Sequence, residues 1–220
     1  TMSTPEFQVV QREMAPKLAA FSDKITQNEA LFKRIEAVYN SPEKAKLNAE
    51  QQRLAWLRYT SFVRAGAKLD GKAKARLTEI NQQLAGLFTK FSNNVLYEEN
   101  NQFIQLKSEA DLAGLPQSIK DAAAAAAAEK KQEGWLIVNT RSSVDPFLTY
   151  SDRRDLREKV WRMFIMRGDN GDERDNNATI TQILQLRAER AKLLGYPTHA
   201  HWRVENSMAK TPDRAMELMM

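Results

Sequence analysis

The chain has 220 residues, 42% apolar and 28% charged, which is enough for one or two domains with a core of their own. It contains no cysteine, which excludes disulfides and thiol chemistry and is compatible with a reducing compartment, so we expect a cytoplasmic protein. No apolar run is long enough to span a bilayer, and the first residues lack the basic-then-apolar plan of a secretory signal.

The net charge of +5 would suit an acidic partner. Acidic and basic residues alternate, however, in runs such as REKVWR and RAERAK, and such mixing is typical of a solvated helix face. Aromatic residues are dispersed along the chain, so no stacking platform for bases is indicated. We therefore expect neither a nucleic-acid nor a membrane partner, and a basic nucleic-acid binder is our least favoured hypothesis.

The first forty residues predict two helices. Thr4-Pro5-Glu6 is a helix opening with a cap, a proline at the first position and an acid next. Apolar residues follow at helical spacing, and Pro16 inside this pattern is expected to kink or divide the helix. Asn28 is expected to cap a second, short helix.

Two further helices are predicted before residue 100. Ser41-Pro42-Glu43 opens one that should run to about Ala65. After the turn at Asp70-Gly71, the most regular helix begins near Ala73 and persists to about Tyr97. Its apolar residues alternate spacings of four and three, a period that forms a packing seam. A helix of this length suits the wall of a larger structure, although a plain bundle helix has the same pattern.

The pattern changes after residue 101. Apolar and polar residues alternate over part of residues 103–107, which predicts a short strand, and the mostly apolar residues 135–139 predict a second one. Between them lies a helix with seven consecutive alanines, which Gly134 is expected to end. The two strands are expected to pair as a small antiparallel element. Residues 141–150, with Pro146 among them, are predicted to be a loop.

Residues 151–202 predict a helical hairpin. The first helix should be capped by Ser151 and carry Leu156, Val160, Met163 and Phe164 on one face. Glycines near residue 170 break it. The second begins near Asn176 or Asn177 and ends at Gly195, with the apolar stripe Ile180, Ile183, Leu184, Ala191 and Leu194.

Arg187 falls on the apolar stripe of this second helix. In the plainer of two interpretations its stem covers apolar surface while the guanidinium reaches water or a carboxylate. In the other it is a buried arginine that fixes a partner helix. The sequence leaves both open.

The only histidines are His199 and His201, in a short helix that Thr198 can cap. Residues two apart point to nearly opposite sides of a helix, so we do not expect these two to be ligands of one metal ion. Thr211-Pro212-Asp213 opens a last helix, and the sequence stops about two turns into it with apolar residues unclaimed. We therefore expect a piece of a longer protein, which packs against residues beyond Met220 and self-associates without them.

Several stretches in order carry a resemblance to the M3 family of zinc oligopeptidases. They are LFKRIEAVY, LFTKFSNNVL, LAGLP, WLIVNTRSSVDPFLTYSDRRDLREKVW, ILQLRAERAKLLGYPTHAHW and MAKTPDRAMELM. None is a catalytic signature, but together they cover nearly the whole chain. Within the family, these stretches resemble bacterial peptidyl-dipeptidases most.

The resemblance implies a mainly α-helical fold that forms part of a two-half, channel-enclosing peptidase with one zinc ion. In that family an HExxH motif supplies zinc ligands and the base, and no such motif occurs here. We therefore predict no catalytic, cofactor-binding or metal-binding residue in this chain, and zinc only in the parent protein. The parent would release dipeptides from the C-termini of short peptides, with a missing C-terminal catalytic domain as this segment's partner.

The expected organisation has three consecutive regions. Residues 1–100 form long helices of a channel wall, residues 101–150 hold the strands, the alanine-rich helix and a loop, and residues 151–220 form the hairpin that leads into the catalytic domain. The alternative is a non-enzymatic helical scaffold or partner-binding module, because a fragment and a true scaffold have the same composition.

Overall fold

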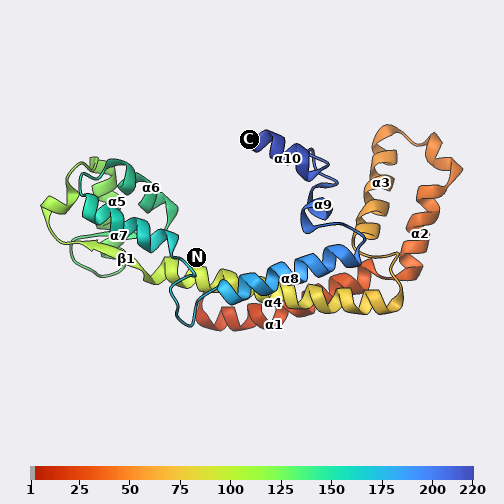
Figure 1. Ribbon diagram of the computed structural model, residues 1–220, viewed down its shortest axis with the longest axis horizontal. Coiled ribbons are helices and arrows are strands. Elements are labelled where there is room, and N and C mark those ends of the chain that lie inside the picture. The colour runs from red at the N-terminus through yellow and green to blue at the C-terminus, as the bar shows by residue number, and fades with distance from the viewer. Residues whose placement is uncertain (1–2) are drawn as a thin grey trace. The chain divides into compact units, whose positions relative to one another are not determined.

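The structure, a computed structural model, describes residues 3–220 and is mainly α-helical with one small antiparallel sheet, as the sequence predicts (Figure 1). By contacts the chain divides into two compact units. Unit 1 comprises residues 3–89 and Ile180–Met220, and unit 2 comprises Lys90–Thr179. This division cuts across the three consecutive regions expected from sequence, of which residues 1 and 2 lie outside the described part.

Unit 1 is built from helices alone. In chain order they are α1 (Pro5–Thr26), α2 (Glu29–Asn40), the short 3-10 helix η1 (Pro42–Lys46), α3 (Ala49–Arg64), the first part of α4 (Gly71–Asn101), most of α8 (Asn177–Leu193), α9 (His199–Val204) and α10 (Pro212–Met219). The side chains of Thr4, Asn28, Thr198 and Thr211 accept hydrogen bonds from first-turn N–H groups, so these predicted caps are confirmed.

Pro16 lies inside α1 without dividing it, because a proline removes one N–H donor while the hydrogen bonds on either side of it persist; a kink there stays a prediction. One prediction in unit 1 is wrong, because the helix expected from Pro42 to Ala65 is two elements. Asn48 Oδ1 accepts from Gln51 N at 2.9 Å and Gln51 Oε1 accepts from Asn48 N at 3.1 Å. This reciprocal cap starts α3 afresh.

The regular seam of α4 packs against α8. Ile80 and Leu84 of α4 and Ile183 of α8 are buried together. Helix α1 is joined to α4 by polar contacts, and Figure 1 shows α1, α4 and α8 side by side. The stripe predicted for α8 is only partly buried, because Leu184 is 57% exposed. Gly195, with φ of 83°, follows the end of α8 as predicted.

Helices α2 and α3 form a second pair within unit 1. The buried Phe32 of α2 stacks on Tyr59 and Phe62 of α3, with ring centres 5.9 and 6.4 Å apart. Tyr39 stacks on Tyr59 at 4.1 Å. Aromatic stacking of this kind, rather than an aliphatic core, joins the two helices.

Unit 2 is a helix-covered hairpin with a closed core. Strand β1 (Phe103–Leu106) pairs antiparallel with β2 (Trp135–Val138), as predicted, with Phe103 opposite Val138. The 3-10 helix η2 (Glu109–Leu112) and α5 (Gln117–Glu129) connect the strands, and α6 (Arg141–Tyr150) and α7 (Arg154–Ile165) follow. The fully or nearly buried apolar side chains of this core are Leu106, Leu112, Leu115, Ala123, Ile137, Val144, Phe147, Leu156 and Val160.

The predicted loop at 141–150 is the helix α6, so that prediction is wrong. Val144 N donates to Thr140 O at 2.9 Å, which begins the helix, and Val144 and Phe147 are completely buried. Burial of these two side chains outweighs the donor that Pro146 lacks.

Two smaller predictions in unit 2 are also corrected. Helix α5 ends at Glu129, and Gly134 instead lets the chain pass close to β1, because a Cβ there would lie 2.4 Å from Leu106 O. Ser151 does not cap α7. Its hydroxyl accepts from Arg153 N at 3.2 Å before the helix begins at Arg154.

Candidate functional site

The two histidines of the chain lie together on α9 but in different surroundings. His201 Nδ1 lies 2.8 Å from the hydroxyl of Thr198, whereas the ring of His199 packs against Trp202 with centres 5.5 Å apart. Within residues 3–220 no group of three or more His, Asp or Glu side chains could hold a metal ion. The residues therefore do not fit a zinc site. That neither histidine is a zinc ligand in the whole protein stays a prediction.

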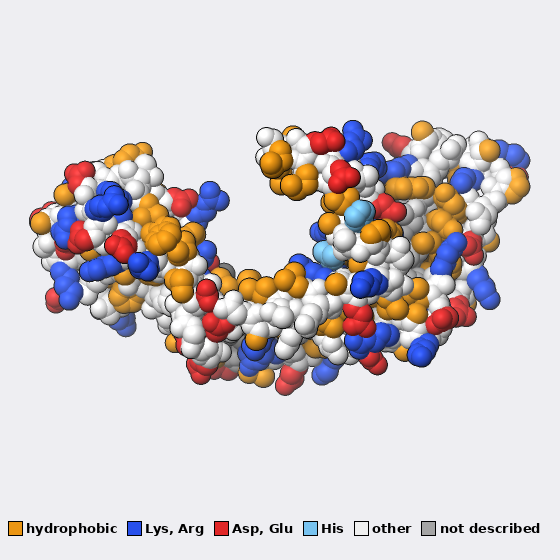
Figure 2. All heavy atoms as spheres, in the orientation of Figure 1, with side chains coloured by type: hydrophobic (Ala, Val, Ile, Leu, Met, Phe, Trp, Pro, Cys, Tyr) orange, Lys and Arg blue, Asp and Glu red, His pale blue; other side chains and the backbone are white. Residues whose placement is uncertain are grey.

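Three arginine side chains lie near enough to His199 to repel its charged form. We define the basic cluster as Arg187, Arg190, His199 and Arg203, from helices α8 and α9 of unit 1. Figure 2 shows the histidine side chains at the surface beside lysine and arginine side chains. The guanidinium of Arg187 lies 5.1 Å from the ring centre of Phe88, and that of Arg190 lies 4.6 Å from the ring of Trp202. Contact with aromatic faces holds both guanidinium groups in place.

The basic cluster has more donors than acceptors. The Nε atoms of Arg187 and Arg190 and Nδ1 of His199 are buried and have no hydrogen-bond partner among the described residues. Arg190 Nη1 donates to Asn81 Oδ1 at 3.2 Å. A buried donor without a partner loses the hydrogen bonds it would make in water, so this arrangement is costly unless something accepts from it.

One acidic side chain, Asp23 of α1, acts on the cluster from inside unit 1. Asn81 Nδ2 donates to its two carboxylate oxygens at 2.9 and 3.1 Å. Burial raises the pKa of Asp23, while Asn81, Thr78 and Arg190 act in the opposite direction. Asp23 is therefore itself poorly placed to carry a full negative charge, and it cannot balance three arginines.

Burial first, and neighbouring positive charge second, shift the pKa of two groups in the cluster. Burial lowers the pKa of His199, and repulsion from Arg187, Arg190 and Arg203 lowers it further. Burial and then Arg187 lower the pKa of Arg190, whereas Asp23 raises it. An anion would favour the charged forms of both His199 and Arg190, which makes the cluster a candidate anion-binding site.

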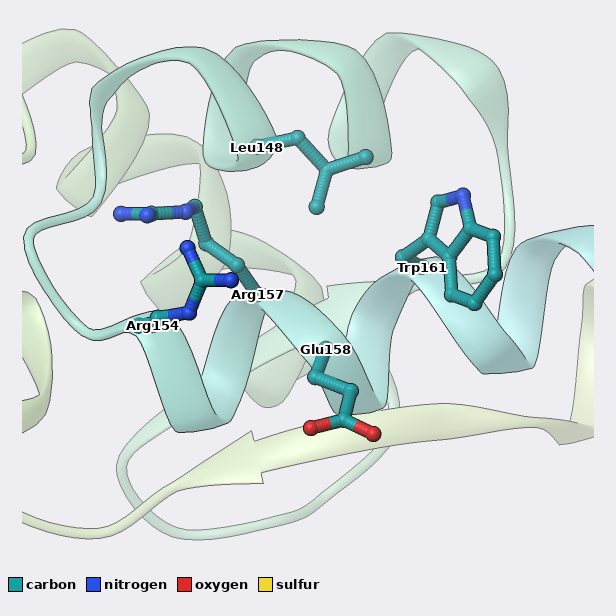
Figure 3. A pocket seen from close by; sticks show the side chains of 5 residues that line it. All are labelled: Leu148, Arg154, Arg157, Glu158 and Trp161. Atoms are coloured by element: carbon teal, nitrogen blue, oxygen red, sulfur yellow. The ribbon is translucent and has the colours of Figure 1, made fainter.

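A second candidate lies in unit 2. Leu148 of α6 and Arg154, Arg157, Glu158 and Trp161 of α7 line an open groove of about 510 Å³. Figure 3 shows both arginines at one end, the indole at the other and Leu148 projecting between them. Arg157 already donates to Ser151 O, and Glu158 accepts from Arg162 at 3.0 Å. The groove therefore shows less unmet hydrogen-bonding capacity than the basic cluster.

The sequence pointed to part of the basic cluster. Arg187 stands out because it interrupts an apolar stripe, and Arg190 lies three residues further along the same helix. The run RAERAK instead indicated a solvated face. The structure matches neither interpretation of Arg187 in full, because the guanidinium rather than the stem lies beside Phe88 of the neighbouring α4, with Nε buried. It shows no carboxylate that accepts from Arg187 among the residues described.

Comparison with known proteins confirms the resemblance noted in the sequence. The profile described as "Peptidase family M3" matches residues 147–220. The chain is 33% identical to the dipeptidyl carboxypeptidase of Escherichia coli over 97% of its own length and 32% of that protein's. It is 31% identical to oligopeptidase A of Salmonella typhimurium, over 99% of the chain and 32% of the relative. It is 34% identical to the probable cytosolic oligopeptidase A of Arabidopsis thaliana, over 98% of the chain and 32% of the relative.

These matches define the chain as peptidase-related, and it belongs to peptidase family M3. It spans about a third of the length of the curated relatives it matches. No helix within residues 3–220 is long and apolar enough to cross a membrane.

Proposed function

We propose that this chain is the non-catalytic N-terminal or middle portion of a zinc metallopeptidase, a peptidyl-dipeptidase that releases dipeptides from the C-termini of short peptides. The observation that carries the proposal is the alignment with a dipeptidyl carboxypeptidase, which takes in nearly all of this chain and about a third of that relative. The rest of such a protein would hold the reacting groups.

The residues of this chain agree with the proposal that the catalytic groups lie in another segment. Neither of its two histidines belongs to an HExxH motif. Zinc, bound by another segment, would polarise water and the scissile carbonyl. The residues of this chain would bind and orient the peptide, which raises the rate by holding the bond to be cleaved in position.

Within this proposal the helices of unit 1 supply part of the substrate-channel wall. Their surface combines the basic cluster with exposed apolar side chains such as Phe88 and Leu184. Cationic and apolar groups side by side suit an unfolded peptide, which offers both carboxylates and apolar side chains. Short peptides and the catalytic domain would be the partners of this chain, in a cytoplasmic enzyme.

The test compares this 220-residue chain with the product of the complete reading frame that encodes it. Each is incubated with zinc and an N-acetylated tetrapeptide with a free C-terminus, and dipeptide release is followed by mass spectrometry. We expect release by the complete product, loss on chelation, recovery with zinc, and none by this chain alone.

Dipeptide release by the pure 220-residue chain would contradict the division of labour. A complete product that neither cleaves peptides nor binds zinc would contradict the enzyme itself and favour the helical scaffold. The sequence after Met220 gives an early indication, because an HExxH motif there supports the peptidase and an immediate stop codon supports the scaffold.

A further inference from the structure

We propose that Arg187 and Arg190 form a carboxylate-binding site whose ligand is the C-terminal carboxylate of a peptide. The inference rests on the proposed peptidase function, and it names the part of the substrate that the basic cluster would recognise.

The first argument is the geometry of the donors. The two arginines lie three residues apart on α8, so their side chains leave the same side of the helix. Each Nε–H group lacks an acceptor among residues 3–220. A carboxylate has two oxygens that accept from guanidinium groups in the plane of the fork, which matches two neighbouring donors better than a single neutral carbonyl does.

The second argument is that the guanidinium groups are held before any ligand arrives. Phe88 lies beside Arg187 and Trp202 beside Arg190, each within about 5 Å of the guanidinium carbon. Asn81 also accepts one hydrogen bond from Arg190. Because these contacts restrict the two long side chains, a ligand loses less free energy in ordering them.

The third argument is charge. Arg203 adds to the positive potential, and Asp23 is occupied by two hydrogen bonds from Asn81. An anion that entered the cluster would meet a net positive field at a partly desolvated position, where attraction is stronger than in water.

The apolar surroundings favour a peptide over an inorganic anion. Leu184 lies one turn before Arg187 on α8 and is 57% exposed, and Phe88 is 37% exposed. A C-terminal residue could place its carboxylate on the arginines and its side chain on these two residues. Phosphate carries at least as much negative charge but gains nothing from the apolar surface.

The experiment measures binding directly, without catalysis. The 220-residue chain is labelled with ¹⁵N-arginine and titrated with N-acetyl-alanyl-leucine, with the C-terminal amide of the same dipeptide, and with inorganic phosphate. We expect the free acid to shift the Nε–Hε signals of Arg187 and Arg190 and to bind roughly tenfold or more tightly than the amide, because charge-assisted hydrogen bonds are lost with the amide.

Three variants locate the effect. Arg187→Gln should reduce the affinity for the acid to that for the amide, and Arg187→Lys, which keeps the charge but lacks the Nε–H fork, should retain part of the difference. Arg76→Gln is the matched control, since Arg76 pairs with Glu189 at 2.7 Å elsewhere on the same two helices. It should bind the acid as the wild type does.

Equal binding of acid and amide, no shift of either signal, or an equal loss in Arg76→Gln would overturn the proposal. So would phosphate that binds as tightly as the acid, which would mark a general anion site. If the acid binds this chain but not the product of the complete reading frame, an acidic side chain of another segment occupies the cluster and the proposal is wrong.

Failure of the site and failure of the proposed function give different results. If the complete product releases no dipeptide but the acid–amide difference persists and disappears in Arg187→Gln, the function fails and the carboxylate site stands. If dipeptides are released with the same KM by wild type and Arg187→Gln, the site fails and the peptidase stands.

Discussion

Units 1 and 2 differ in how completely each covers its own apolar surface. Unit 2 is the shorter of the two, yet it holds most of the fully buried apolar side chains, gathered between the β1–β2 hairpin and its helices. Unit 1 buries a narrow seam between α4 and α8 and carries most of the exposed large apolar side chains among the described residues.

The two units also differ in how well their buried polar groups are hydrogen-bonded. In unit 2 the buried Glu98 accepts from Gly168 N at 2.8 Å and from Asn170 Nδ2 at 2.9 Å. The unpartnered side-chain atoms there belong to neutral amides, Asn93 and Asn139. In unit 1 they belong mainly to groups that can carry charge. A closed core with satisfied polar groups is built for stability, whereas an open surface with unmet charged donors is built to meet a ligand or partner.

The largest expected effect is on the core of unit 2. Phe147→Ala removes a completely buried ring, and we expect the free energy of unfolding of unit 2 to fall by about 3–5 kcal/mol. Hydrogen-exchange mass spectrometry over residues 103–165 measures it. Leu184→Ala, at an exposed position of unit 1, should change stability by less than about 0.5 kcal/mol. Equal effects would remove the contrast between the units.

A smaller loss is expected at the buried carboxylate of unit 2. Glu98→Ala leaves two donors, Gly168 N and Asn170 Nδ2, without their acceptor, and should cost about 2–3 kcal/mol. Chemical denaturation gives the value. The neighbouring Glu99→Ala breaks a partly exposed pair with Arg167 and should cost no more than about 1 kcal/mol. A Glu99 variant as damaging as the Glu98 variant would contradict this account of Glu98.

The smallest effects are expected from pH, and their sign differs between the units. In unit 2, backbone hydrogen bonds, that from Lys107 first, lower the pKa of Asp111 below its ordinary value of 3.8. The folded state then binds this proton less tightly than the unfolded chain does. The contribution of Asp111 is therefore present above pH 3.8 and is lost as the pH falls through the lowered pKa. In Asp111→Asn, the free energy of unfolding of unit 2 should fall less steeply with decreasing pH below 3.8 than it does in the wild type.

In unit 1 burial raises the pKa of Asp23, so the sign is opposite. The stabilising contribution of protonated Asp23 is fully present below pH 3.8 and is lost as the pH rises through the raised pKa. His199 has the opposite effect on stability. Because its pKa is lowered, its stabilising contribution is fully present above pH 6.5 and is lost as the pH falls through the lowered pKa. Hydrogen exchange of α1 and α4 between pH 7 and 3 should show a gain in protection as the pH falls through the raised pKa of Asp23, and Asp23→Asn should abolish that gain. The same gain in that variant would assign it to another group.

Much of the fold could be predicted because its signals are local. The caps at Thr4 and Asn28, the seam of α4 and each of the two strands could be predicted from spacing and residue type within a few residues, whereas the pairing of the strands was the simplest arrangement of two short strands. The failures at residues 42–65 and 141–150 have one kind of cause. At residues 42–65 the prediction started the helix at Pro42, but the reciprocal cap of Asn48 and Gln51 starts a new helix. At residues 141–150 the prediction took Pro146 as a sign of a loop, but the burial of Val144 and Phe147 favours a helix.

The candidate site was less accessible from sequence. Arg187 could be singled out and Arg190 placed beside it, since a helix fixes which residues share a side. Arg203 comes from another helix, and Asp23 from a third, so their distances to Arg190 depend on packing that no local pattern encodes. The interleaved charges of RAERAK also concealed the cluster, because residues one or two apart on a helix face different sides, and Glu189 pairs with Arg76 rather than with Arg187 or Arg190.

The sequence by itself determined the helical class, most element boundaries and the membership of peptidase family M3, because these depend on short-range periodicity and on matches in order along the chain. Only the tertiary structure decided that α6 is a helix, that the chain divides into two units, and that three buried nitrogen atoms of α8 and α9 have no hydrogen-bond partner among residues 3–220. Burial and the balance of charge are properties of atoms brought together from distant positions, and they exist only once the chain has folded.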